Sequence, residues 1–296
     1  MNSPLQRHVF FLALAFMLTS GCVTGRLSQF RNFANAGASY EQASQAVLMQ
    51  AGTAAIEADS LIAIQGRSSL TTPEERRRYI LESDQELRKR LSLLDKIAQH
   101  GKLLQCYFET LAELADPHAP PELETEAGGL YDAIIQMSPG LKNSNFGSAK
   151  IQDKIPQATD FGVAVFRVKA LESELKSRAQ AIERELALQE AAFRAIVDMM
   201  TADLTASLQL HETQDVINPF ATATTLSTGW VDRRQDILKA RVAAESMQCV
   251  VDAIGQLREN FKALAGNTLS VSALRKTIAS VHSIKDFKEA IQKVSH

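Results

Sequence analysis

The sequence has little glycine, proline or aromatic side chain: 14 Gly, 8 Pro and 6% Phe, Trp and Tyr among 296 residues. It also lacks an excess of one charge, because the formal net charge is only −2. Few helix breakers, together with abundant Ala, Leu, Gln, Glu, Lys and Arg, favour helix over strand. The near-neutral balance excludes a strongly basic class of protein, so we expect no nucleic acid partner.

Short catalytic and cofactor-binding motifs are missing as well. The sequence has no Gly-x-Ser-x-Gly elbow, phosphate-binding loop or Cys-x-x-Cys cluster. His211-Glu212 is not followed by a second histidine at helical spacing, so it is not a zinc-protease motif. Asp198, Asp203 and His211 could approach one metal ion only through a break in a helix, and we interpret them as solvated residues. The sequence therefore predicts no metal, no cofactor and no enzymatic activity.

One apolar run stands near the start of the chain. Arg7 precedes the ten apolar residues Val9–Leu18, and three small residues follow, Thr19, Ser20 and Gly21. Ten residues are too few to cross a membrane, since a spanning helix needs roughly 20. Residues 1–21 are therefore typical of a secretory signal peptide.

The segment Leu18-Thr19-Ser20-Gly21-Cys22 resembles the lipobox of bacterial lipoproteins. In that family the cysteine is acylated on sulfur, the preceding peptide is removed, and the new N-terminus is acylated. The resemblance covers only the first 22 residues and departs at Thr19, where the family usually has leucine. It implies a lipid anchor at Cys22 and a short tether over residues 22–28. A plain signal peptide or an uncleaved anchor are the alternatives.

The residue after the cysteine bears on location. Enteric-type lipoproteins with aspartate at this position tend to stay at the inner membrane, whereas this sequence has Val23. The resemblance thus favours the outer membrane, on its periplasmic side, as the location. Two or more acyl chains would hold the protein there durably.

The rest of the chain predicts long helices. The expected helical ranges are about 29–65, 72–116, 122–137, 159–216, 229–264 and 272–294. The second range has the clearest start, because Thr72 can cap the helix, Pro73 suits its first turn and Glu75 completes a capping box. We expect the stretch 138–147 to be irregular, because it contains Ser138-Pro139-Gly140 and several polar residues.

Apolar residues recur every three and four positions along these ranges. In the second helix one row is Ile80, Leu87, Leu94, Gly101, Phe108 and Ala115. Such rows form the seams of coiled coils and long bundles. We therefore predict an all-α fold: residues 29–296 form one elongated, mostly up-and-down antiparallel helical bundle with coiled-coil-like seams. Interleaved charges in the fourth helix predict a solvated face; the acidic members are Glu172, Glu174, Glu183, Glu185 and Glu190.

Two cysteines remain after the expected processing. Cys106 and Cys249 both fall outside the apolar rows and in the later halves of their helices. In an oxidising compartment they can pair as a disulfide. The alternative is two separate thiols, each covered by a neighbouring helix.

A loop opposite the expected anchor is the candidate partner site. The turn 66–72 and the loop 217–229 should both lie far from the membrane in an up-and-down bundle. The candidate residues there are Pro219, Phe220, Leu226 and Trp230, the only tryptophan. Exposed aromatic side chains on a loop can mark an interaction site. The alternative is that Phe220 and Trp230 cap the end of the core.

These features predict a membrane-tethered protein of the bacterial cell envelope that acts as a structural scaffold or adaptor. Its partners would be membrane lipid, through acylated Cys22, and an envelope protein. The alternative is a bundle that holds a small apolar or cationic ligand, with the stretch 138–157 at its mouth. An uncharacterised enzyme is a third, less favoured interpretation.

Overall fold

The computed structural model describes residues 4–146, 149–156, 168–245 and 247–292. The helices are α1 (Pro4–Gly66), α2 (Pro73–Leu114), α3 (Glu122–Lys142), α4 (Lys169–His211), α5 (Asn218–Thr222), α6 (Trp230–Glu245), α7 (Gln248–Ala265) and α8 (Val271–Gln292). A small antiparallel ladder is formed by two strands of two residues each, β1 (Asn145–Phe146) and β2 (Ala149–Lys150). Two short 3-10 helices cover Arg67–Ser69 and Ile151–Lys154, and a π-helix covers Glu212–Ile217. The predicted all-α bundle is confirmed. The helix start expected near Thr159 and the end near Val294 lie outside the described residues.

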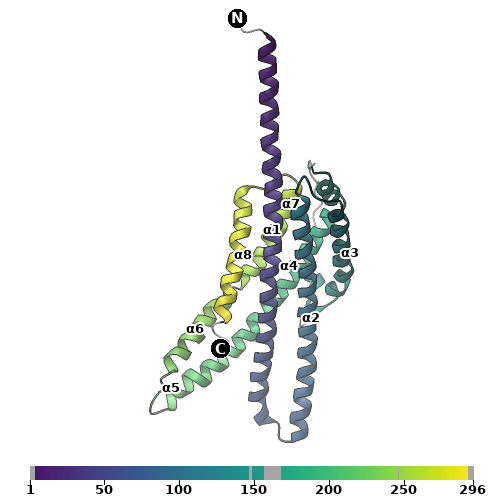
Figure 1. Cartoon of the computed structure of the whole chain (residues 1–296). Helices are drawn as coiled ribbons and strands as arrows, with labels where there is room; N and C mark the ends of the chain where they lie inside the picture. The colour runs from purple at the N-terminus through teal and green to yellow at the C-terminus, as the bar shows by residue number, and fades with distance from the viewer. Residues whose placement is uncertain (1–3, 147–148, 157–167, 246, 293–296) are drawn as a thin grey trace.

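The bundle divides into a shared body and two arms (Figure 1). The N-terminal part of α1 projects alone from one end of the body. At the opposite end, the last turns of α1 and the first turns of α2 form a hairpin arm, residues 59–92. The end of α4, the π-helix, α5 and α6 form a lateral arm, from Leu208 to Ala240. The turn 66–72 and the loop 217–229 therefore both lie away from the N-terminus, but on separate, diverging arms.

Helix α4 runs through the middle of the body. It packs against α1, α2, α3, α6 and α7. Its predicted apolar rows are buried, including Leu175, Ile182, Leu186 and Phe193. The predicted solvated face is wrong for four of its five acidic residues, because neighbouring helices cover the side of α4 that carries them. Basic residues of the same charged pattern, Lys169, Lys176 and Arg184, are exposed. The acidic residues Glu174, Glu183, Glu185 and Glu190 are buried there as well.

Small residues let α1 approach its neighbours closely. A Cβ atom at Gly37 would lie 2.9 Å from the ring of Phe108 in α2, so only glycine fits this crossing without a shift. Ala51, Ala54 and Ala58 are likewise buried along the same helix. The alanine-rich composition of α1 thus corresponds to a tightly packed helix pair.

The predicted capping box of α2 is present. The Glu75 backbone N–H donates to Thr72 Oγ1 at 3.1 Å, and the Thr72 N–H donates to Glu75 Oε2 at 2.9 Å. These hydrogen bonds also hold the pKa of Glu75 below its ordinary value. The seven-residue row is buried from Leu94 onward. It is not buried in the hairpin arm, where residues 59–92 include no buried side chain. Helix α4 contacts this part of α2 near its base, through the ion pair between Arg90 and Asp203.

Four helix boundaries differ from the predicted ones. Helix α1 begins at Pro4 rather than near residue 29, so the expected tether 22–28 is part of the helix. Helix α3 continues through Pro139 to Lys142 rather than ending near Met137. The Ser138 hydroxyl lies within hydrogen-bond distance of the Ile134 carbonyl and of Glu185 in α4.

The other two differences concern predicted helices that do not continue as one α-helix. The predicted helix 159–216 changes to a π-helix after His211. The predicted helix 229–264 is two helices, α6, which ends at Glu245, and α7, which begins at Gln248.

Candidate functional site

The tip of the lateral arm carries a stacked aromatic pair. The rings of Phe220 and Trp230 lie 5.5 Å apart at an interplanar angle of 25°. The indole Nε1–H of Trp230 donates to the backbone carbonyl of Val216 at 3.1 Å, which fixes the ring against the π-helix. Phe220 lies on the outer side of this pair and is 66% exposed. The arm therefore presents an apolar ring on a rigid support.

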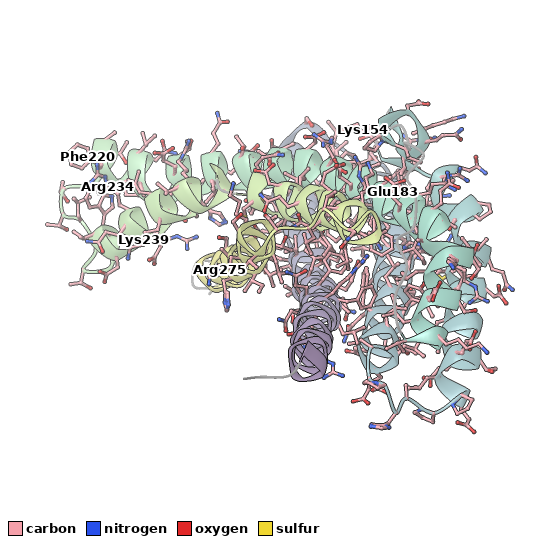
Figure 2. The ribbon with its side chains drawn as sticks, turned by 90° about the horizontal axis from the view of Figure 1, so that it is seen from above. Lys154, Glu183, Phe220, Arg234, Lys239 and Arg275 are labelled. Carbon is pink, nitrogen blue, oxygen red and sulfur yellow. The ribbon has the colours of Figure 1, made fainter. Side chains whose placement is uncertain are left out.

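Figure 2 shows this tip far from the central body, with Phe220 and Arg234 close together at its end. The Arg234 guanidinium lies 5.9 Å from the centre of the Trp230 ring, within cation–π range. Leu226 is 41% exposed in the loop, and Pro219 stands in the first turn of α5, where its fixed φ suits a helix start. The tip thus combines apolar and cationic groups.

The two aromatic residues of the arm differ in their surroundings. Trp230 packs against a small separate core of Leu208, Val216, Ile237 and Ala240. It therefore caps this satellite core, whereas Phe220 and Leu226 face solvent. The four candidate residues come together at one tip, and the turn 66–72 is not part of it.

Polar contacts fix the lateral arm to the body. His211 Nε2 lies 3.2 Å from Glu57 Oε1 on α1, and its Nδ1 lies 3.1 Å from Asp215 Oδ2 in the π-helix. Arg233 of α6 donates through Nε to Asp215 at 3.1 Å. The arm is therefore braced at its base by residues from α1, α4, the π-helix and α6.

A second feature, absent from the predictions, is a layer of polar side chains inside the body. His100 of α2 is fully buried; its Nε2 lies 3.2 Å from Glu185 Oε2, and its Nδ1 lies 2.8 Å from Gln189 Nε2. Glu185 also accepts a hydrogen bond from Ser138 of α3, and Lys142 Nζ lies 3.9 Å from its other oxygen. The layer thus joins α2, α3 and α4.

Glu41 of α1 extends the same layer without a partner. It is 1% exposed, and within the described part of the chain neither of its carboxylate oxygens has a hydrogen-bond partner. Its carboxylate occupies the space beside Gly101, where an added Cβ would lie 2.8 Å from Glu41 Oε2 and 3.5 Å from Gln189 Nε2. Burial raises the pKa of Glu41 well above its ordinary value.

A third buried group joins α2 to the start of α4. The Tyr107 hydroxyl donates to Glu174 Oε1 at 3.0 Å, and Arg178 pairs with the other oxygen of that carboxylate. Burial raises the pKa of Glu174, against the opposing effect of Arg178. Burial, followed by the adjacent Glu174 charge, raises the pKa of Tyr107.

Buried ions also connect α4 to α7. Arg258 Nη1 lies 3.2 Å from Glu190 Oε2, and Arg258 Nε lies 3.6 Å from Glu183 Oε1. Lys262 Nζ lies 3.2 Å from the same Glu183 oxygen, and Arg194 pairs with Glu190 at 3.0 Å. These opposite charges attract one another across the interface between α4 and α7.

The residues considered for a metal site serve as ion-pair partners elsewhere. Asp198 pairs with Lys154 at 2.7 Å, Asp203 pairs with Arg90 of α2, and His211 contacts Glu57. Among the described residues, no group of three or more His, Cys, Asp or Glu side chains is arranged to hold a metal ion.

The cysteines of the body are separate in the structure. Cys106 on α2 and Cys249 on α7 are both free and half-buried. Of the two arrangements that the sequence leaves open, the structure has the two separate thiols. Burial, and then the charge of Asp252, raises the pKa of the Cys249 thiol.

For the N-terminal region, the structure shows only a long apolar helix. Helix α1 runs through Cys22 without a break, and among its residues from Gly25 onward the first buried one is Phe30. Among the described residues, 25–69 is long and apolar enough to cross a membrane, but the core helix of a soluble protein meets the same criterion. Much of this stretch packs into the body. Comparison of the chain with known protein families, curated proteins and solved structures finds no match.

Proposed function

We propose that the protein is a lipid-anchored scaffold or adaptor of the bacterial cell envelope, with its partner-binding surface at the tip of the lateral arm. The observation that supports this is the exposed Phe220 ring, stacked on an immobilised Trp230 at the end away from the N-terminus. Aromatic side chains on rigid supports are common anchors of protein interfaces. Acylated Cys22 would hold the other end at the periplasmic side of the outer membrane, close to the body.

The anchor is tested by replacing the lipidation residue. In cells, the Cys22→Ser variant is expected to move from the membrane fraction to the soluble fraction by about tenfold or more, because the acyl chains supply the membrane affinity. Mass spectrometry of the purified protein checks the same point through the mass of the N-terminal peptide. Cys106→Ser is the matched control and should remain with the membrane. A Cys22→Ser protein that still sediments with membranes would refute the lipid anchor.

The partner surface is tested by photo-crosslinking in intact cells. A crosslinking residue in place of Phe220 is expected to trap one specific envelope protein, and Phe220→Ser should weaken that partner's binding by about tenfold. Met49 on α1 is 72% exposed and lies outside the arm, so a crosslinker there is the matched control. Equal capture from both positions, or capture from neither, would contradict the assignment. Thermal unfolding by circular dichroism confirms that Phe220→Ser stays folded.

A further inference from the structure

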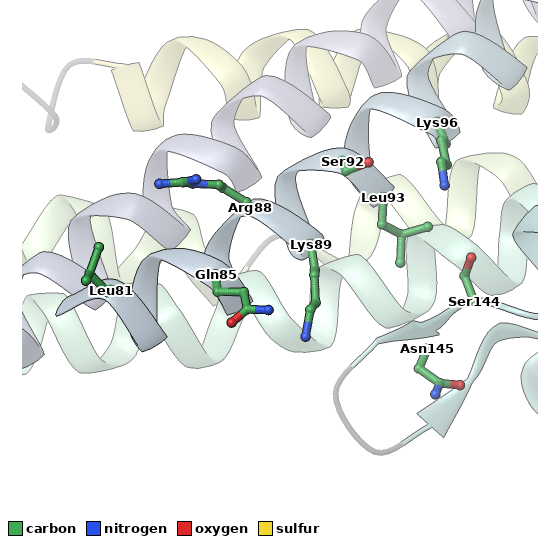
Figure 3. Close-up of a pocket in the computed structure, with 9 residues that line it drawn as sticks. All are labelled: Leu81, Gln85, Arg88, Lys89, Ser92, Leu93, Lys96, Ser144 and Asn145. Carbon is green, nitrogen blue, oxygen red and sulfur yellow. The ribbon is translucent and has the colours of Figure 1, made fainter. Parts of the chain in front are cut away.

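A groove runs along one face of α2, beside the segment that follows α3. It has a volume of about 770 Å³, within the usual size of ligand sites. Gln85, Lys89, Leu93 and Lys96 line it from α2, at spacings that place them on one side of the helix. Ser144 and Asn145 form the opposite wall, and Figure 3 shows Lys89 and Lys96 pointing toward that wall on either side of Leu93.

The charges in the groove have one sign. Its lining includes Arg88, Lys89 and Lys96 and no carboxylate. Arg88 points away in Figure 3 and pairs with Asp84 at 3.6 Å. Lys89 pairs with Glu86 at 2.7 Å on an exposed face, where such a pair contributes little. Among the described residues Lys96 has no ion-pair partner. The groove therefore attracts an anion.

The groove continues into a second cleft that is more apolar. The two share Lys89, Leu93 and Asn145, and the second has a volume of about 920 Å³ between α1, α2 and α4. Ile62, Leu87 and Met199 line this extension. Four acidic residues also line it. Asp203 pairs with Arg90, and Asp59 accepts a hydrogen bond from Ser83. The other two, Glu82 and Glu86, are exposed on α2, and Glu86 pairs with Lys89. An apolar chain can thus extend along Ile62, Leu87 and Met199 while the two exposed glutamates stay in water.

We propose that this groove binds an anionic amphiphile, with a phosphate or carboxylate group held between Lys89 and Lys96 and an apolar chain running over Leu93 toward Met199. The two lysines are seven residues apart on α2, about 10.5 Å along the helix axis, so they can contact two sides of one head group. The side-chain amide of Asn145 supplies a hydrogen-bond donor across the groove, whereas the Ser144 hydroxyl already donates to the Gly140 carbonyl at 2.7 Å. The source of the molecule is either a free single-chain amphiphile or a lipid of the membrane.

The test uses the Cys22→Ser full chain and isothermal titration calorimetry with dodecyl phosphate below its micelle concentration. Lys89→Gln/Lys96→Gln is expected to weaken binding at least tenfold. The matched control is Arg77→Gln/Lys102→Gln, which removes two exposed cations of α2 outside the groove and leaves the same net charge. Met199→Gln should weaken dodecyl phosphate but leave the response to inorganic phosphate unchanged. Equal weakening by the control pair, or equal affinity for neutral dodecyl maltoside, would overturn the proposal.

A second experiment distinguishes a membrane lipid from a free amphiphile as the source of the ligand. Vesicles of phosphatidylglycerol are compared with vesicles of phosphatidylcholine in a flotation assay. Binding to the anionic vesicles that is lost in Lys89→Gln/Lys96→Gln supports a membrane lipid as the ligand. Binding of dodecyl phosphate without vesicle binding supports a free amphiphile. Absence of binding to both anionic probes overturns the site.

Discussion

Replacement of Arg258 by methionine is expected to lower the free energy of unfolding by about 3–5 kcal/mol. Methionine keeps most of the side-chain volume but removes the charge that lies between Glu183 and Glu190. Both glutamates are buried, and the contacts to Arg258 are ion pairs without aligned hydrogen bonds. Removing the central cation leaves negative charges inside the protein with less compensation, and this cost falls on the folded state alone.

Urea unfolding followed by circular dichroism measures this effect. Arg275→Met on the exposed side of α8 is the matched control and should change the free energy of unfolding by less than about 0.5 kcal/mol. The double variant Glu183→Gln/Arg258→Met should recover part of the loss, because it removes one of the uncompensated charges. A loss below about 1 kcal/mol in Arg258→Met would mean that Lys262 and Arg194 neutralise the two glutamates without it.

The Glu41→Gln variant is expected to be more stable than the parent protein by about 1–3 kcal/mol at pH 8, because the buried carboxylate of Glu41 has no hydrogen-bond partner among the described residues. Burial raises its pKa in the folded chain above the ordinary value of 4.5. The folded protein therefore retains this proton at pH values where the unfolded chain has released it. Stability from this group is present below pH 4.5 and is lost as the pH rises through the raised pKa.

The pH dependence distinguishes ionisation from packing. The difference in unfolding free energy between Glu41→Gln and the parent should be small at pH 4.5 and should grow toward pH 8. Taking this difference removes the contribution of Glu174, whose pKa is also raised and which is present in both proteins. Glu113→Gln, at an exposed position of α2, should show no such trend. A constant difference across the pH range would contradict a raised pKa at Glu41.

The sequence predicts where the helices lie along the chain better than it predicts which helices pack against one another. The start of α2 follows from local chemistry, because Thr72, Pro73 and Glu75 cap the helix through contacts within four residues. The apolar rows of α4 are also visible, since they depend only on helical spacing. The number of helices around α4 is a tertiary property, so Glu183 and Glu185 look like members of a solvated face in the sequence.

The residues of the candidate sites also differ in how well the sequence predicts them. The tip residues Phe220 and Trp230 can be singled out because an aromatic pair beside a proline-containing loop is rare in this chain. The polar interior gives no comparable signal, because His100, Glu41 and Gln189 meet from three different helices. The π-helix after His211 and the division of the predicted helix 229–264 into α6 and α7 also lack a glycine or proline that would mark them.

Helix α1 connects the projecting N-terminal segment to the hairpin arm without interruption. Each residue of an α-helix adds about 1.5 Å of length and about 100° of rotation. One residue inserted before Phe30 would therefore lengthen the projecting segment by only about 1.5 Å, yet would rotate that segment by about 100° relative to both arms. A small change in the length of this segment thus has little effect on the distance between the N-terminus and the arms, but a large effect on the direction in which the arms point.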